Sequence, residues 1–151
     1  MRCEVLPTLC LPPLRYPSPM SFHPRSLLYV PATSARMLAS AGRRGADALV
    51  LDLEDAIAPA QKAQARAMLQ PAIASLRGQC PVLVRINADR ALAQADTEAA
   101  LQAGCDGLVI PKVESAADVQ RIAALADNHG SPPVLLQLSL IHISEPTRLR
   151  R

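Results

Sequence analysis

Residues 82–111 read VLVRINADRALAQADTEAALQAGCDGLVIP, and this stretch decides the fold class. It opens with an apolar run at 82–87, continues through an Ala-rich segment near 90–103, and closes with a second apolar run at 107–111. Runs that are apolar at nearly every position are typical of strands buried on both faces of a parallel sheet. A strand, a helix and a second strand of this kind predict a parallel βαβ unit.

The same alternation continues on both sides of this unit. Further strands are predicted at 26–31, 48–53 and 134–137, and further helices near 34–44, 59–76 and 115–127. We expect Pro71 to kink or interrupt its helix, and Ser115 with Asp118 resembles a capping box. Spacing alone leaves two architectures open: about five β/α units of an eight-stranded TIM barrel, or a complete five-stranded flavodoxin-like sheet. The second would be a binding or signalling module without catalysis.

Composition argues against several classes of partner. The chain of 151 residues has a net charge of +3, but residues 25–137 hold eleven basic and eleven acidic side chains. Aromatic residues make up 2% of the chain, which argues against a stacking platform for nucleic acid. No apolar run is long enough to span a membrane. The cysteines show no metal-binding spacing, so we predict a cytoplasmic protein in which Cys80 and Cys105 are small buried hydrophobes.

Polar side chains gather where three predicted strands end. They are Asp52, Glu54 and Asp55 at the second strand, Arg85 near the end of the third, and Lys112 and Glu114 after the fourth. In both architectures ligands bind at the carboxyl ends of parallel strands. Asp55 and Glu114 precede helices, so a role as surface caps is equally open for them. Arg85 lies inside an apolar run and needs a carboxylate or phosphate partner, from the protein or from a substrate.

Four blocks of sequence resemble a known family. RSLLYVPA at 25–32, DALVLDLEDAIAPAQKAQAR at 47–66, VLVRIN at 82–87 and GLVIPKVES at 107–115 resemble the citrate lyase β-subunit-like branch of the HpcH/HpaI aldolases. The resemblance covers about residues 25–137 and implies the N-terminal part of a TIM barrel. It also implies a Mg²⁺-dependent carbon–carbon lyase that acts on the CoA thioester of a hydroxy acid, of citryl-CoA or malyl-CoA type. Cleavage would pass through an enolate, whose charge a divalent cation stabilises.

The resemblance also implies roles for individual residues. Arg85 looks like the family's substrate arginine, which grips the acid portion of the substrate through two parallel hydrogen bonds. The acidic block at 52–55, together with Lys112 and Glu114, would line the site, and no catalytic residue is assigned. The whole protein would be a homotrimer, a homohexamer or a subunit of a lyase complex with an acyl carrier partner.

One further pair matches the family pattern away from the strand ends. Lys62 and Arg66 match a K-x-x-x-R spacing on the second predicted helix. We interpret them as salt-bridged residues of a helix that packs on the barrel.

The two ends of the chain differ from its middle. Residues 1–24 hold six of the fourteen prolines, and we interpret them as an unstructured leader or as sequence upstream of the true start. Residues 138–148, LSLIHISEPTR, resemble the one-frame translation of an adapter used in transposase-based DNA library preparation. We therefore interpret 138–151 as a sequencing artefact.

The implied metal ligands fall outside the family-like region. The family's metal-binding Glu and Asp are both expected after Gln137, and position 139, where the Glu would stand, is Ser139. We therefore expect no metal ligand in this chain, and a fragment without activity of its own.

Overall fold

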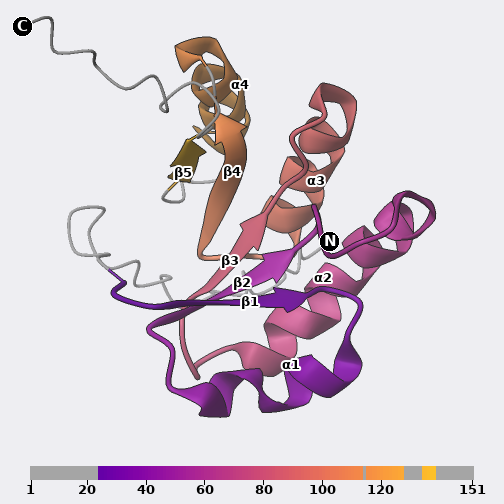
Figure 1. Ribbon diagram of the computed structural model, residues 1–151, viewed down its shortest axis with the longest axis vertical. Coiled ribbons are helices and arrows are strands. Elements are labelled where there is room, and N and C mark those ends of the chain that lie inside the picture. Colours follow the sequence, from indigo (N-terminus) through magenta and orange to yellow (C-terminus); the bar gives the residue numbers. More distant parts are fainter. Residues whose placement is uncertain (1–23, 114, 128–133, 139–151) are drawn as a thin grey trace, which may run out of the picture.

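The computed structural model describes residues 24–113, 115–127 and 134–138 (Figure 1). Strands and helices alternate along the described chain. Their bounds are β1 (Leu27–Pro31), α1 (Ala35–Ala41) followed by the 3-10 turn η1 (Gly42–Arg44), β2 (Ala48–Asp52), the 3-10 turn η2 (Pro59–Gln61) leading into α2 (Lys62–Leu76), β3 (Val82–Arg85), α3 (Arg90–Gln102), β4 (Gly107–Val113), α4 (Ala116–Asp127) and β5 (Val134–Leu138).

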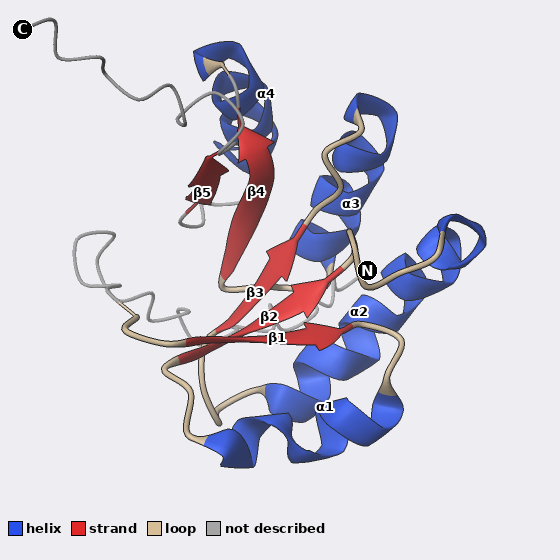
Figure 2. Ribbon diagram, in the orientation of Figure 1, coloured by secondary structure: helices blue, strands red, loops and turns tan. Residues whose placement is uncertain are grey.

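The order of the strands decides between the two architectures. The five strands form one parallel sheet in the order β1-β2-β3-β4-β5, so each strand pairs with the next one along the chain. A flavodoxin-like sheet reverses its direction at a switch point, and its helices cover both faces. Figure 2 shows α1 to α4 on one side of a sheet whose strands turn progressively from β1 to β5. The described fold is therefore that of a partial TIM barrel, and the flavodoxin-like alternative is wrong.

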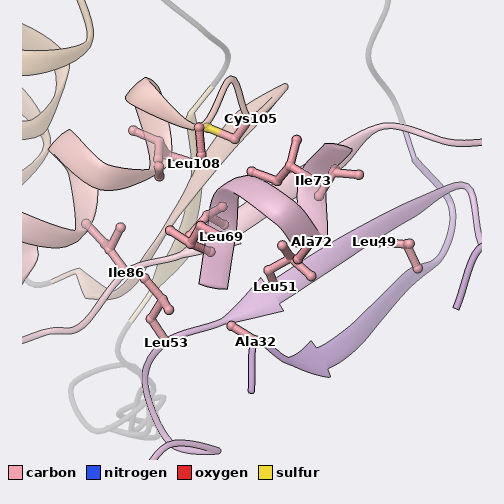
Figure 3. Packing of buried hydrophobic residues seen from close by; sticks show 14 of the residues in the cluster. Ala32, Leu49, Leu51, Leu53, Leu69, Ala72, Ile73, Ile86, Cys105 and Leu108 are labelled. Atoms are coloured by element: carbon pink, nitrogen blue, oxygen red, sulfur yellow. The ribbon is translucent and has the colours of Figure 1, made fainter. Parts of the chain in front are cut away.

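The two faces of the sheet bury different sets of side chains. The larger cluster joins strand residues such as Leu49 and Leu51 to helix residues such as Leu69 and Ile73 of α2 (Figure 3). The smaller cluster contains no helix residue. Its buried members are Ala48, Val50, Leu83 and Val109, from three adjacent strands. The smaller cluster therefore marks the face that lines the interior of a barrel.

The structure confirms the predicted cap before α4 and tests the predicted effect of Pro71 on α2. The Ser115 hydroxyl donates to Asp118 Oδ2 at 2.8 Å and accepts from the Asp118 backbone N–H, as a capping interaction requires. Pro71 lies inside α2, which runs without interruption from residue 62 to residue 76. An interruption at Pro71 is therefore wrong, because Leu69 and Ile73 are buried on either side of the proline, whereas a kink there stays a prediction. Their packing offsets the missing backbone hydrogen bond.

The remaining composition-based predictions concern cysteines and membranes. Cys105 is buried at 2% exposure, whereas Cys80 is half-buried, so the prediction for Cys80 holds only in part. In the part of the chain that the structure describes, no helix combines the length and the apolarity needed to cross a membrane. The leader predicted at 1–24 and the tail predicted at 138–151 lie outside the described residues, except for Pro24 and Leu138.

Candidate functional site

The site begins where β2 ends, at a carboxylate that organises the following turn. Asp52 is the last residue of β2, and it follows Ala48 and Val50 on the inner face of the sheet. Its Oδ1 accepts the backbone N–H of Glu54 at 2.8 Å, and its Oδ2 accepts that of Ala56 at 3.1 Å. An Asp side chain that accepts backbone N–H groups two and four residues ahead stabilises a tight turn.

Arg85 forms a bidentate ion pair with this same carboxylate. The register of β2 and β3 places Asp52 opposite Arg85, so both side chains leave the same face of the sheet. Arg85 Nε lies 2.8 Å from Asp52 Oδ1, and Arg85 Nη2 lies 2.7 Å from Oδ2. The pair is nearly buried, with side-chain exposures of 11% for Arg85 and 4% for Asp52.

The ion pair fixes the charge of both partners. Burial acts to raise the pKa of Asp52, but the hydrogen bonds from Arg85 and from the Glu54 backbone, with the charge of Arg85, outweigh it and lower that pKa. The hydrogen bond to Asp52 raises the pKa of Arg85, and nearby carboxylates add to that effect. Both groups are therefore ionised at neutral pH.

Glu54 lies between two cations. Its Oε2 is 3.3 Å from Arg85 Nη1, and its Oε1 is 2.8 Å from Lys112 Nζ. The residue is 7% exposed, and neither carboxylate oxygen accepts a well-formed hydrogen bond within the described part of the chain. Asp55 makes longer contacts of 3.6 Å with the same two cations, and its side chain is 64% exposed. Direct charge contacts with Arg85 and Lys112 therefore balance the buried Glu54 carboxylate.

An irregular backbone directs Lys112 into this cluster. The pairing of β4 with β5 shifts register between Ile110 and Val113. Pro111 has no N–H to donate at that point, which suits a bulge. Lys112 has a φ of 49°. This is a left-handed backbone conformation, which residues other than glycine adopt at a cost of about 1–2 kcal/mol. The contact with Glu54 raises the pKa of Lys112, and the charges of Glu54 and Asp55 add to this.

The structure adds Tyr29, which sequence reasoning missed. The Arg85 guanidinium carbon lies 4.9 Å from the centroid of the Tyr29 ring, within the range of a cation–π contact. Tyr29 is 38% exposed and belongs to β1. The alternation of side chains along β1 could have indicated this position. Tyr29 is two residues after Leu27, which packs against the smaller cluster, so both side chains leave the inner face of the sheet.

Arg66 makes the expected contact, whereas Lys62 makes a different one. Arg66 does form a salt bridge, with Nη1 at 3.0 Å from Asp96 Oδ1. Lys62 instead donates to the backbone carbonyl oxygen of Leu53, at 2.6 Å, and to that of Glu54. The salt-bridge interpretation is therefore confirmed for Arg66. Within the described residues, the contacts of Lys62 are with backbone carbonyls, which carry no sequence signature.

The site residues predicted from sequence meet at the carboxyl ends of three adjacent strands. Asp52, Glu54, Asp55, Arg85 and Lys112 form one continuous set of ion pairs. Glu114, the sixth, lies outside the described residues. The three carboxylates exceed the two cations by one negative charge. Side chains at this end of a barrel bind ligands in TIM-barrel enzymes.

The described residues do not form a Mg²⁺ site by themselves. Mg²⁺ prefers carboxylate oxygens, and three carboxylates do meet here. However, the described part of the chain contains no group of three side chains that could hold a metal ion. Both oxygens of Asp52 bond to Arg85, and the oxygens of Glu54 face Arg85 and Lys112. The placement of the metal ligands elsewhere stays a prediction.

Comparison with known families identifies the family of this chain. Residues 25–131 match the family model described as HpcH/HpaI aldolase/citrate lyase. The chain belongs to this family. It is 42% identical over 106 residues to the (3S)-malyl-CoA thioesterase of Cereibacter sphaeroides, an overlap of 68% of this chain and 37% of that protein. It is 36% identical over 103 residues to the citrate lyase subunit beta of Leuconostoc mesenteroides, covering 67% of this chain and 34% of the relative.

Two solved structures resemble the fold of this chain. The chain resembles the crystal structure of RipC from Yersinia pestis, with 36% sequence identity and a TM-score of 0.54 over 74% of this chain and 45% of that one. It also resembles the malate synthase of Haloferax volcanii, with a TM-score of 0.55 over 74% and 38% of the two chains. At 22% identity the second likeness shows the fold alone. The match to the curated relatives spans little more than a third of their length.

Proposed function

We propose that this family member carries the acid-binding part of a Mg²⁺-dependent carbon–carbon lyase that acts on the CoA thioester of a hydroxy acid. The observation that carries the proposal is the position of Arg85, nearly buried at the carboxyl end of the inner face, with Lys112 beside it across Glu54. A guanidinium in that place suits a carboxylate of the substrate.

The Arg85 guanidinium makes short hydrogen bonds through two of its nitrogens and longer contacts through the third. Asp52 holds the Nε and Nη2 groups at 2.8 Å and 2.7 Å. Nη1 lies 3.3 Å from Glu54 and 3.6 Å from Asp55. Asp55 is the most exposed of the three acids and the farthest from Arg85. We expect the substrate carboxylate to take the place of Asp55 at Arg85 Nη1 and Lys112 Nζ.

This arrangement orients the bond that breaks. In a malyl-type thioester the carbon that bears the hydroxyl also bears the carboxylate. When the hydroxyl proton is removed, the bond to the carbon next to the thioester carbonyl breaks. Its electron pair passes to that carbon, giving an enolate of the acyl-CoA and a free oxo acid. Arg85 and Lys112 would hold the carboxylate of the departing oxo acid throughout the reaction.

The Mg²⁺ requirement is proposed from family membership. A bound divalent cation supplies stabilisation of the negative charge that develops on oxygen. The described residues supply no three-ligand group for it. We therefore propose that the polypeptide of 151 residues does not turn over substrate alone. Mixing it with Mg²⁺ and (3S)-malyl-CoA should release neither acetyl-CoA nor CoA, and measurable release of either contradicts this proposal.

Thioester hydrolysis is the second candidate reaction, favoured by the relative named (3S)-malyl-CoA thioesterase. The two reactions differ in their products. Cleavage of malyl-CoA gives an oxo acid and acetyl-CoA, whereas hydrolysis gives malate and free CoA. The relative named citrate lyase subunit beta supports the lyase reaction and a whole protein that is a subunit of a lyase complex. A homotrimer and a homohexamer are the alternative assemblies that we propose from family membership.

The decisive test is discrimination between a ligand that carries the hydroxy-acid unit with its carboxylate and one that lacks that unit. Calorimetric titration should show that (3S)-malyl-CoA binds at least about tenfold more tightly than acetyl-CoA, since a hydrogen bond between charged groups contributes about 1.5–3 kcal/mol. Arg85→Lys should remove most of this difference, because a single ammonium group cannot keep the paired bonds to Asp52 and also present a donor to the substrate carboxylate. Arg43→Lys, on the exposed turn η1, is the matched control. Equal affinities for the two ligands in the wild-type chain, or unchanged discrimination in Arg85→Lys, would refute the proposal.

A further inference from the structure

We propose that Lys62 is a positioning residue for this site. By holding the backbone of Leu53 and Glu54, it keeps the Glu54 carboxylate between the two cations of the cluster. The inference rests on the proposed function, because it concerns the same site, but it makes a structural prediction that can be measured without any ligand.

Lys62 is poorly placed to stabilise its own helix. It is the first residue of α2, and Gln61 before it provides no side-chain cap. A cation at a helix N-terminus meets the positive end of the helix dipole, which is unfavourable. The first turn of α2 contains no acidic residue that would offset this charge. The position of Lys62 therefore needs another explanation.

The explanation lies in the loop after β2. Lys62 Nζ turns back to donate to the carbonyl oxygens of Leu53, at 2.6 Å, and of Glu54. These two residues immediately follow Asp52 and include the buried acid of the site. Hydrogen bonds from a charged donor are among the stronger ones in proteins. Lys62 thus links the start of α2 to the segment that carries Glu54.

Asn87, which follows β3, provides a second donor to the Leu53 carbonyl oxygen. Asn87 Nδ2 donates to Leu53 O at 2.9 Å and to Asp96 Oδ2 at 2.6 Å. Asp96 is fully buried in α3, and it also accepts the Asn87 backbone N–H and the Arg66 guanidinium. The Leu53 carbonyl oxygen is therefore held from α2 by Lys62 and from the end of β3 by Asn87.

The combined contacts leave Glu54 little freedom. Its N–H donates to Asp52, its carbonyl oxygen accepts from Lys62, and its carboxylate contacts Arg85 and Lys112. Without Lys62 the carbonyl side of this segment loses a charged partner. Glu54 would then exchange its buried ion contacts for water, and the cations that receive the substrate carboxylate would lose their shared neighbour.

Amide hydrogen exchange of the full chain tests this directly. Lys62→Met keeps the aliphatic stem and removes the donor. It should speed exchange of the Glu54 and Ala56 amides by about tenfold or more, while the Val109 amide in the sheet changes by less than about twofold. Lys62→Arg should restore slow exchange, and Arg43→Met should change neither. Unchanged exchange at Glu54 and Ala56, or a uniform increase that includes Val109, would overturn the positioning role.

Two additions keep the test decisive. If Lys62→Met does not fold, Lys62→Gln retains one donor group and should give an intermediate exchange rate at Glu54. The affinity for (3S)-malyl-CoA should fall about fivefold to tenfold in Lys62→Met and recover in Lys62→Arg. If the wild-type chain does not distinguish malyl-CoA from acetyl-CoA, the proposed function fails, and the exchange rates still decide the role of Lys62.

Discussion

Replacing Asp52 by asparagine should destabilise the chain by about 3 kcal/mol at neutral pH. Asp52 accepts four hydrogen bonds, two from Arg85 and one each from the N–H groups of Glu54 and Ala56. Asparagine keeps one carbonyl oxygen and so retains two of them. Its amide nitrogen then faces two donors, one of which is charged. Losing a hydrogen bond to a charged group costs about 1.5–3 kcal/mol and losing a neutral one about 1 kcal/mol.

The loss should depend on pH in a defined direction. Because the pKa of Asp52 is lowered in the folded chain, its ionised form stabilises folding above the ordinary value of about 3.9. That contribution disappears as the pH falls through the lowered pKa. The difference in unfolding free energy between wild type and Asp52→Asn should therefore be constant from about pH 7 to 5 and should shrink below about pH 4.

Urea denaturation followed by circular dichroism measures both effects. The matched control is Asp89→Asn, the same chemical change at the N-cap of α3. Asp89 Oδ1 accepts the N–H groups of Ala91 and Leu92, both at 3.0 Å. Asparagine is as good an N-cap as aspartate, so this variant should lose less than about 0.5 kcal/mol. Equal losses in the two variants, or a loss in Asp52→Asn that persists undiminished at pH 2, would refute the reasoning.

Two further predictions follow from the backbone at Lys112 and from the buried thiol. Lys112→Gly should be about 1 kcal/mol more stable than Lys112→Ala in urea denaturation, because glycine adopts a φ of 49° without strain. A higher stability of Lys112→Ala, the usual order of these two residues in a strand, would contradict this. Cys105 should resist iodoacetamide at pH 8 until the chain is denatured, because burial raises the pKa of its thiol to about 12. Peptide mapping by mass spectrometry measures the alkylation, and alkylated Cys105 in the folded chain would contradict the prediction.

Sequence pattern predicted the elements and the meeting of the site residues for a physical reason. Side chains alternate across a strand, and parallel strands bring their carboxyl ends to one edge. Asp52 and Arg85 each continue the inner-face alternation of their strand, and the register places them opposite each other. Pattern could not choose between a barrel and an open sheet, because both use the same spacing of strands and helices. The order of the strands supplied that choice.

The predictions that failed involve interactions that depend on tertiary structure. The local rule for proline predicted a kink or an interruption in α2, and burial of the residues around Pro71 accompanies a helix without interruption. The predicted strand at 107–111 stopped at Pro111, whereas β4 continues to Val113 through the strained Lys112. No sequence rule anticipates a left-handed lysine, because its cost is offset by Glu54 and Asp55 in the turn after β2.

Lys62 shows the limit of sequence reasoning most clearly. Its spacing from Arg66 matches a family pattern, and residues four apart share one face of a helix. A salt bridge can be expected for Arg66 from sequence, because acidic residues such as its partner Asp96 are visible there. The same reasoning could not find the partners of Lys62, because every residue offers the same carbonyl oxygen. A cation at a helix N-terminus without a nearby acid is the signal that remains, and it indicates a backbone acceptor brought close by the fold.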